Sequence, residues 1–136
     1  MAAALYIETS AALRAILERG TTPEVEARIE AAAVLITSRL TLVEAGRALL
    51  RLGAEGRVAE TRLSDAARAL DLLWARCDLW EITSGVCDLA AHVAPAKPLR
   101  TLDALHLATY LLARRRLGDV ELLSADRRLL DAAGQP

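Results

Sequence analysis

The chain has 136 residues, of which 54% are hydrophobic and 3% aromatic, with 17 Lys and Arg against 18 Asp and Glu. This length and apolar content predict one domain with an aliphatic core. A formal net charge of −1 excludes a protein that coats nucleic acid through an overall basic surface. The N-terminal segment has no basic region, and no uncharged apolar stretch is long enough to span a membrane, so we expect neither a signal peptide nor a membrane anchor.

Four short β-type runs alternate with helical segments. The runs cover residues 4–8, 33–38, 78–83 and 120–124, and the first two are nearly continuously apolar, as in strands buried on both faces. The helical segments cover residues 10–19, 23–31, 41–53, 57–77, 84–94, 101–118 and 125–134. This alternation predicts an α/β fold with a parallel sheet and right-handed crossovers. Function in such sheets gathers beyond the carboxyl ends of the strands.

Two cysteines, Cys77 and Cys87, have a spacing that matches no zinc motif. We therefore expect two free thiols in a reducing compartment, which predicts a cytoplasmic protein.

Four carboxylates follow the predicted strand ends. Glu8 ends the first run, and Glu44 is predicted in the first turn of the helix after the second run. Asp103 lies in the first turn of the helix at 101–118, and Asp126 follows the fourth run. Each has a purely structural alternative. Glu44 matches a capping box with Thr41, the two Asp residues suit a helix dipole, and Glu8 can accept from the N–H groups that open the next helix.

Together, the four carboxylates predict a metal site. Four like charges at one sheet edge repel one another unless cations lie among them or some groups are protonated. Hard oxygen ligands suit Mg²⁺ or Mn²⁺. Such ions activate a water molecule and stabilise charge on a phosphate, which is the chemistry of phosphodiester hydrolysis.

Four segments resemble the sequence blocks of PIN-domain ribonucleases, and in particular the VapC toxins of bacterial toxin–antitoxin pairs. These segments are LYIETSAAL, TSRLTLVEAGRAL, LRTLDALHLATYLL and LLSADRRLLDAA, in the order of the family. The resemblance covers essentially the whole chain, so that residues 1–136 form a single PIN domain. It implies a three-layer α/β/α fold with a parallel sheet of four strands, or five where the edge strand of the family follows the last helix. Because the chain stops at DAAGQP, we expect that fifth strand to be missing.

The resemblance also implies site residues, cofactors and partners. Glu8, Glu44, Asp103 and Asp126 stand at the acidic positions of the family, where they would bind one or two Mg²⁺ or Mn²⁺ ions and cleave RNA. Ser10 matches the hydroxyl beside the first acid; it either orients that acid or caps the helix. The implied partners are an RNA substrate, a small cognate antitoxin protein and a second copy of the chain. Residues 11–17 and 48–52 are candidates for an antitoxin groove.

The first acid of the family is usually Asp, whereas this chain has Glu8. The added CH₂ moves the carboxylate by about 1.5 Å, and a misplacement near 1 Å can cost on the order of 100-fold in rate. Two alternatives therefore accompany the ribonuclease toxin: a catalytically weakened PIN-fold binding protein that acts through a partner, and a PIN nuclease of RNA processing. His106, three residues after Asp103, has two interpretations: a catalytic base or, as we favour, a packed histidine hydrogen-bonded in the core.

Overall fold

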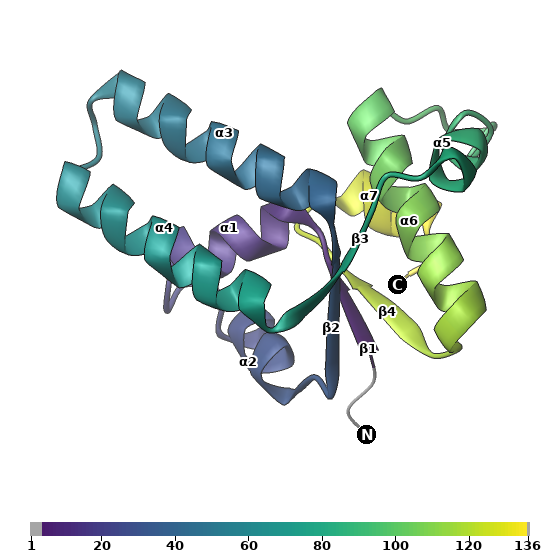
Figure 1. Cartoon of the computed structure of the whole chain (residues 1–136), viewed down its shortest axis with the longest axis horizontal. Helices are drawn as coiled ribbons and strands as arrows, with labels where there is room; N and C mark the ends of the chain where they lie inside the picture. The colour runs from purple at the N-terminus through teal and green to yellow at the C-terminus, as the bar shows by residue number, and fades with distance from the viewer. Residues whose placement is uncertain (1–3, 136) are drawn as a thin grey trace.

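The computed structural model describes residues 4–135 as a four-stranded parallel sheet with helices on both faces (Figure 1). The strand order is β3-β2-β1-β4. The strands are β1 (Ala4–Ile7), β2 (Val34–Ser38), β3 (Cys77–Trp80) and β4 (Val120–Leu123). The helices are α1 (Thr9–Leu17), α2 (Pro23–Ala31), α3 (Arg39–Glu55), α4 (Glu60–Ala75), α5 (Ser84–Ala90), α6 (Thr101–Leu117) and α7 (Arg127–Ala132). The predicted parallel α/β fold is confirmed, and residues 4–135 contain no fifth strand.

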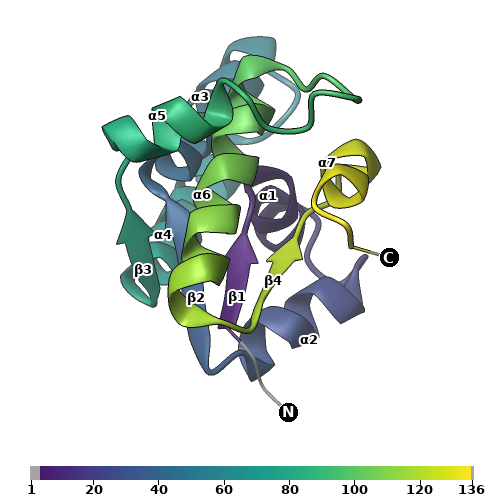
Figure 2. The same cartoon turned by 90° about the vertical axis from the view of Figure 1, so that its right-hand side faces the viewer.

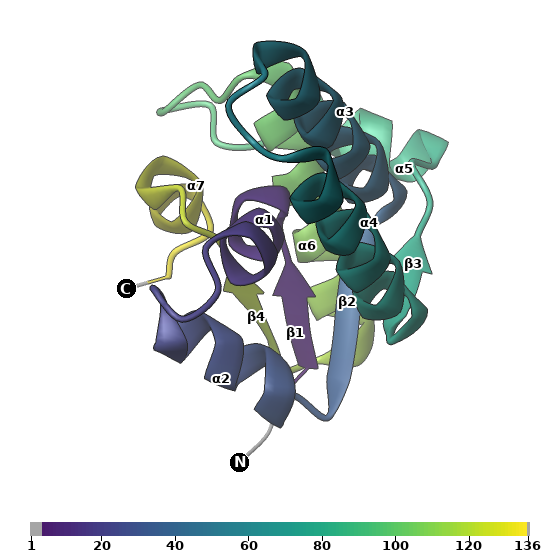
Figure 3. The same ribbon diagram turned by 90° about the vertical axis from the view of Figure 1, so that its left-hand side faces the viewer.

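The alternation of side chains along β1 separates two apolar cores. Leu5 and Ile7 pack with α1, α2 and α4, which cover one face of the sheet (Figure 3). Tyr6 points to the opposite face and packs with α6 and α7 (Figure 2). Because successive side chains of a strand point to opposite faces, a strand between two helical layers must be apolar at every position. This explains the unbroken apolar run that precedes Glu8.

β1 lies at the point where the strand order of the sheet reverses. Its neighbours are β2 on one side and β4 on the other, paired in parallel register from Ala4 onward. The connection from β1 to β2 runs through α1 and α2, whereas the connection from β3 to β4 runs through α5 and α6. In open parallel sheets, ligands bind at such a switch point, outside the carboxyl ends of the strands. Glu8 directly follows β1 at this position.

Two predicted features of α3 are wrong. The helix does not end at Gly53 but continues to Glu55, and Gly56, with φ of +70°, ends it. Gly53 lies within the helix beside α4, where a Cβ would make an ordinary contact of 3.4 Å with Leu63 Cδ1. The residue that opens the helix is Ser38, whose hydroxyl accepts from the backbone N–H of Leu40 at 3.0 Å.

Because α3 begins at Arg39, Glu44 lies in its second turn and not in the first. The predicted capping box between Thr41 and Glu44 is therefore wrong. Thr41 is fully buried, and its hydroxyl lies 2.9 Å from that of Thr37. The side chain of Glu44 is free of any capping role and points to other partners.

In residues 4–135, every helix is too short or too polar to cross a membrane. Both cysteines are free, as predicted, with Cys77 half-buried and Cys87 exposed.

Candidate functional site

Glu8 is a buried carboxylate held by three donors. It is the N-cap of α1, where Oε2 accepts from the backbone N–H of Ser10 at 3.1 Å. Its other oxygen, Oε1, accepts from the hydroxyl of Ser10 and from Ser124 Oγ, the latter at 2.6 Å. Only 6% of Glu8 is exposed. The predicted capping contact of Glu8 is therefore present, and the longer side chain of Glu bends back onto its own helix.

Ser10 and Ser124 join the start of α1 to the turn after β4. Ser10 Oγ accepts from the backbone N–H of Ala125 at 2.9 Å, and Ser124 Oγ accepts from that of Asp126 at 3.0 Å. Both hydroxyls then donate to Glu8. We call Glu8, Ser10 and Ser124 the serine clamp. Ser10 contacts the first acid, as one of its two predicted roles requires, whereas the N-cap of α1 is Glu8 and not Ser10.

Glu44 of α3 contacts a buried histidine of α6. Its Oε1 lies 2.5 Å from His106 Nε2 and accepts the hydroxyl of Thr9 at 2.6 Å. Within residues 4–135, no side chain bonds to Glu44 Oε2. The Glu44 side chain keeps 24% of its surface exposed, whereas that of His106 keeps 1%. One oxygen of Glu44 therefore faces the protein, and the side chain remains reachable from solvent.

His106 continues this contact into the core. Its Nδ1 lies 2.9 Å from the hydroxyl of Tyr6, and both residues are fully buried. The predicted packed and hydrogen-bonded histidine is thus confirmed, with the addition that its partner is a candidate metal ligand. Tyr6 and Thr9 join the site without having been predicted. Their only sequence signal is their place on either side of Glu8.

The contacts of Glu44 decide its charge. Burial raises the pKa of this carboxyl, but the hydrogen bonds from His106 and Thr9 and the attraction of the imidazole outweigh burial and leave the pKa below its usual range. Burial acts in the same direction on Tyr6 but is not outweighed there: it raises the pKa of the phenol well above its ordinary value, with further help from the charge of Glu8. At neutral pH, Glu44 is therefore ionised and Tyr6 keeps its proton.

The other two predicted acids have local partners. Asp103 lies in the first turn of α6, as predicted, with Oδ2 3.5 Å from Arg100 Nε and 19% of its side chain exposed. It precedes His106 by three residues, so the two share a face of α6. Asp126 is the N-cap of α7, where Oδ1 accepts from the backbone N–H of Arg128 at 2.9 Å. The metal-binding role of all four acids stays a prediction.

Comparison with known families identifies the family of this domain. The sequence profile of the PIN domain matches residues 5–135. The chain belongs to the PIN domain family.

Named relatives of this PIN domain occur in Mycobacterium tuberculosis. The chain is 34% identical over 131 residues to ribonuclease VapC46, and this alignment covers 96% of this chain and 91% of VapC46. It is 38% identical over 96 residues to ribonuclease VapC45, which covers 69% of this chain. The match spans 64% of the length of VapC45 and likewise of VapC49.

Solved structures share the fold. PAE2754 from Pyrobaculum aerophilum is 25% identical, with a TM-score of 0.67 over 97% of this chain and 81% of that chain. A toxin–antitoxin complex from Klebsiella pneumoniae contains a chain that is 19% identical, with a TM-score of 0.64 over 93% of this chain and 89% of its own. These structures agree with the parallel sheet and helix layers described above.

PIN-domain ribonucleases generally depend on divalent metal ions. In the part of the chain that the structure describes, no three His, Cys, Asp or Glu side chains form a group that could hold such an ion. Glu44 and Asp103 nevertheless fit a hydrated cation, because both are carboxylates with exposed surface near the same face of α6. Mg²⁺ commonly binds through one or two carboxylates and retains several waters. In Glu8, Oε1 already accepts two hydroxyls, whereas Oε2 accepts only the backbone N–H of Ser10, so Oε2 is the oxygen of Glu8 that could still bind an ion.

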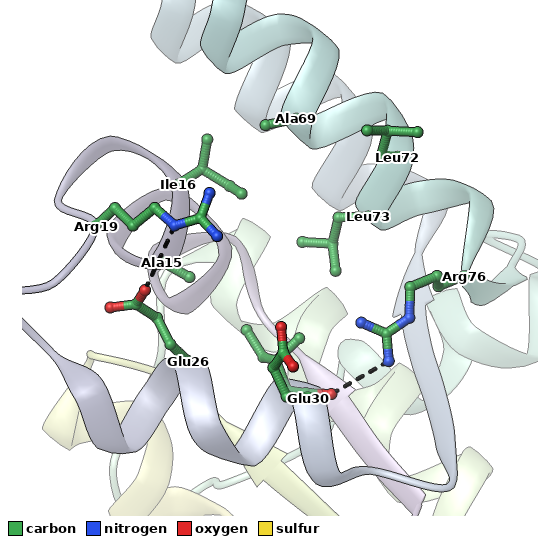
Figure 4. Close-up of a pocket in the computed structure, with 10 residues that line it drawn as sticks. Ala15, Ile16, Arg19, Glu26, Glu30, Ala69, Leu72, Leu73 and Arg76 are labelled. Atoms are coloured by element: carbon green, nitrogen blue, oxygen red, sulfur yellow. Dashed lines mark hydrogen bonds and ion pairs between the residues drawn. The ribbon is translucent and has the colours of Figure 1, made fainter.

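Both predicted groove segments line pockets. One pocket of about 330 Å³ lies between α1, α2 and α4 and includes Ala15 and Ile16 (Figure 4). Arg19 and Glu26 form an ion pair across it at 3.9 Å. A second pocket of about 600 Å³ lies between α3 and α4 and includes Leu50, of which 63% is exposed. Residues 11–17 and 48–52 therefore contribute to two separate hollows and not to one groove.

Proposed function

We propose that this PIN domain is a metal-dependent endoribonuclease and the toxin component of a toxin–antitoxin pair, using Mg²⁺ or Mn²⁺. The observation that carries the proposal is the juxtaposition of Glu44 with the α6 helix that bears Asp103, beside the carboxyl end of β1. Relatives named ribonuclease VapC, one of them aligned over 96% of the chain, support it. In this proposal residues 1–136 act as a single domain.

The chemistry assigns different tasks to the acids. Glu44 and Asp103 would hold the ion, which when bound supplies a water of lowered pKa and neutralises charge on the phosphate. Asp126 would act through an intervening water, because its Oδ1 already caps α7. Glu8 would bind through Oε2, because Oε1 already accepts from the hydroxyls of Ser10 and Ser124. The hydroxyls of Ser10 and Ser124 would thus fix the position of the Glu8 carboxylate beside the ion.

The proposed partners are an RNA substrate, a small antitoxin protein and a second copy of this chain. The pocket between α1, α2 and α4 is lined by the buried apolar residues Ile29 and Leu73 and by Leu72, which is largely exposed. An antitoxin segment with apolar side chains suits such a surface. The fold shared with a chain of the toxin–antitoxin complex from Klebsiella pneumoniae supports an antitoxin as partner.

Cleavage of RNA with Mg²⁺ or Mn²⁺ tests the proposal. Asp103→Asn keeps the size of the side chain but removes its charge, and we expect it to lower the rate by on the order of 100-fold or more. Asp71→Asn is the matched control, because Asp71 is an exposed residue of α4. If the wild-type protein and Asp103→Asn give the same RNA products at the same rate, the ribonuclease proposal fails.

Glu8→Asp separates an active enzyme from a weakened binding protein. The shorter side chain restores the usual first acid of the family. Cleavage by both wild type and Glu8→Asp supports an active enzyme. Cleavage by Glu8→Asp alone would favour the binding protein that acts through its partner.

A further inference from the structure

His106 connects the hydrophobic core to the candidate metal ligand Glu44. Both of its ring nitrogens lie within hydrogen-bond distance of a side chain: Nδ1 at 2.9 Å from the Tyr6 hydroxyl and Nε2 at 2.5 Å from Glu44 Oε1. The ring of Tyr6 also packs edge-on against His106, with centroids 6.1 Å apart. Every buried histidine needs partners for its ring nitrogens, and here one of the two partners is a candidate metal ligand.

The partners define the tautomer of His106. Glu44 Oε1 also accepts the hydroxyl of Thr9, and a carboxylate oxygen is an acceptor, so the 2.5 Å contact places a proton on Nε2. With Nε2 protonated, a neutral ring has an acceptor at Nδ1, and the Tyr6 hydroxyl can donate to it. The donors then run in one direction, from Tyr6 to His106 to Glu44. Every polar atom of the ring is satisfied in this arrangement.

The same contacts orient the Glu44 carboxylate. Thr9 Oγ1 donates to Oε1 at 2.6 Å, so this oxygen receives two donors from the protein. No described side chain bonds to Oε2. A carboxylate fixed by two donors on one oxygen presents the other in a constant direction. Groups of this kind behind a metal ligand commonly change metal affinity or activity by about 10–100-fold when removed.

We propose that His106 is a positioning residue: held by Tyr6, it fixes the Glu44 carboxylate so that Oε2 faces the substrate and ion. The inference rests on the proposed function. It differs from the role of a catalytic base, because the His106 side chain is 1% exposed and its Nε2 is already bonded to Glu44. The ring cannot reach a water or an RNA atom without leaving the core.

Two amide variants test this proposal. The amide nitrogen of Gln can reach the place of Nε2, whereas that of Asn reaches only the place of Nδ1. We expect His106→Gln to retain cleavage near the wild-type rate and His106→Asn to lose about 10–100-fold in kcat. The KM for RNA should change little in both, since His106 is buried and does not touch the substrate. Equal rates in the two variants would overturn the proposal.

The tautomer supplies a second test that needs neither metal nor RNA. Nitrogen NMR of the metal-free protein, labelled at histidine, should show His106 with a proton on Nε2 and none on Nδ1. His92, the other histidine, is exposed and serves as an internal reference. A proton on Nδ1 alone would refute the positioning role. If the wild-type protein cleaves no RNA, the proposed ribonuclease function fails, but the tautomer still decides whether His106 donates to Glu44.

Discussion

Replacing Ser124 with Ala should weaken the fold by an amount that depends on Glu8. The substitution removes the hydrogen bond to Glu8 Oε1, 2.6 Å long, and the bond from the Asp126 N–H at 3.0 Å. A hydrogen bond to a charged group contributes about 1.5–3 kcal/mol, and a neutral one about 0.5–1.5 kcal/mol. Because Glu8 is 6% exposed, water cannot replace the lost donor. We therefore expect Ser124→Ala to lower the free energy of unfolding by about 2–4 kcal/mol.

A double-mutant cycle in urea, followed by circular dichroism, isolates the contact with Glu8. In a Glu8→Ala background, Ser124→Ala should cost only about 1 kcal/mol, the share of the Asp126 N–H bond. Ser64→Ala, on an exposed turn of α4, is the control and should change stability by less than about 0.5 kcal/mol. Equal costs of Ser124→Ala in the two backgrounds would show that the serine clamp contributes nothing to stability.

Three further substitutions or reactions have defined outcomes. Thr37→Val should lower the free energy of unfolding in urea by about 1–3 kcal/mol, because the fully buried hydroxyl donates to the Ile7 carbonyl at 2.6 Å; an unchanged midpoint would contradict this. Leu129→Ala should cost about 2–5 kcal/mol, since Leu129 is fully buried against the second core, and a loss under 1 kcal/mol would disprove that packing. Burial raises the pKa of the Cys77 thiol to about 11. In a Cys87→Ser protein, Cys77 should therefore react with iodoacetamide far more slowly when folded than in urea, and equal rates would refute its burial.

The strands could be predicted because their pattern has one physical cause. A strand between two helical layers buries both faces, and the run from Leu5 to Ile7 therefore has no polar position. The same reasoning places Glu8 at the carboxyl edge, since parallel strands end on the same side of the sheet. Asp103 and Asp126 follow from local signals, because charge near a helix start obeys short-range rules.

Contacts between distant residues could not be predicted in this way. Glu44 and His106 are 62 positions apart. The residues around Glu44 match a capping box, and no local pattern indicates that Glu44 bonds to a distant histidine instead. Ser124 meets Glu8 across 116 positions. Gly53 and Gly56 look alike in sequence, yet only Gly56 adopts a positive φ. In each case the tertiary environment decides between two locally acceptable arrangements.

The order β3-β2-β1-β4 has a consequence for synthesis of the chain. β1 emerges first and finds its neighbour β2 about thirty residues later, but its other edge stays unpaired until β4 has been made. Until then Glu8 lacks its partner Ser124, and His106, the partner of Tyr6, is made only shortly before β4. Long-range strand pairing of this kind is slow, because the entropy cost of closing the loop comes before the stabilising contacts form. A nascent chain therefore lacks these contacts of the site until β4 and Ser124 have been made.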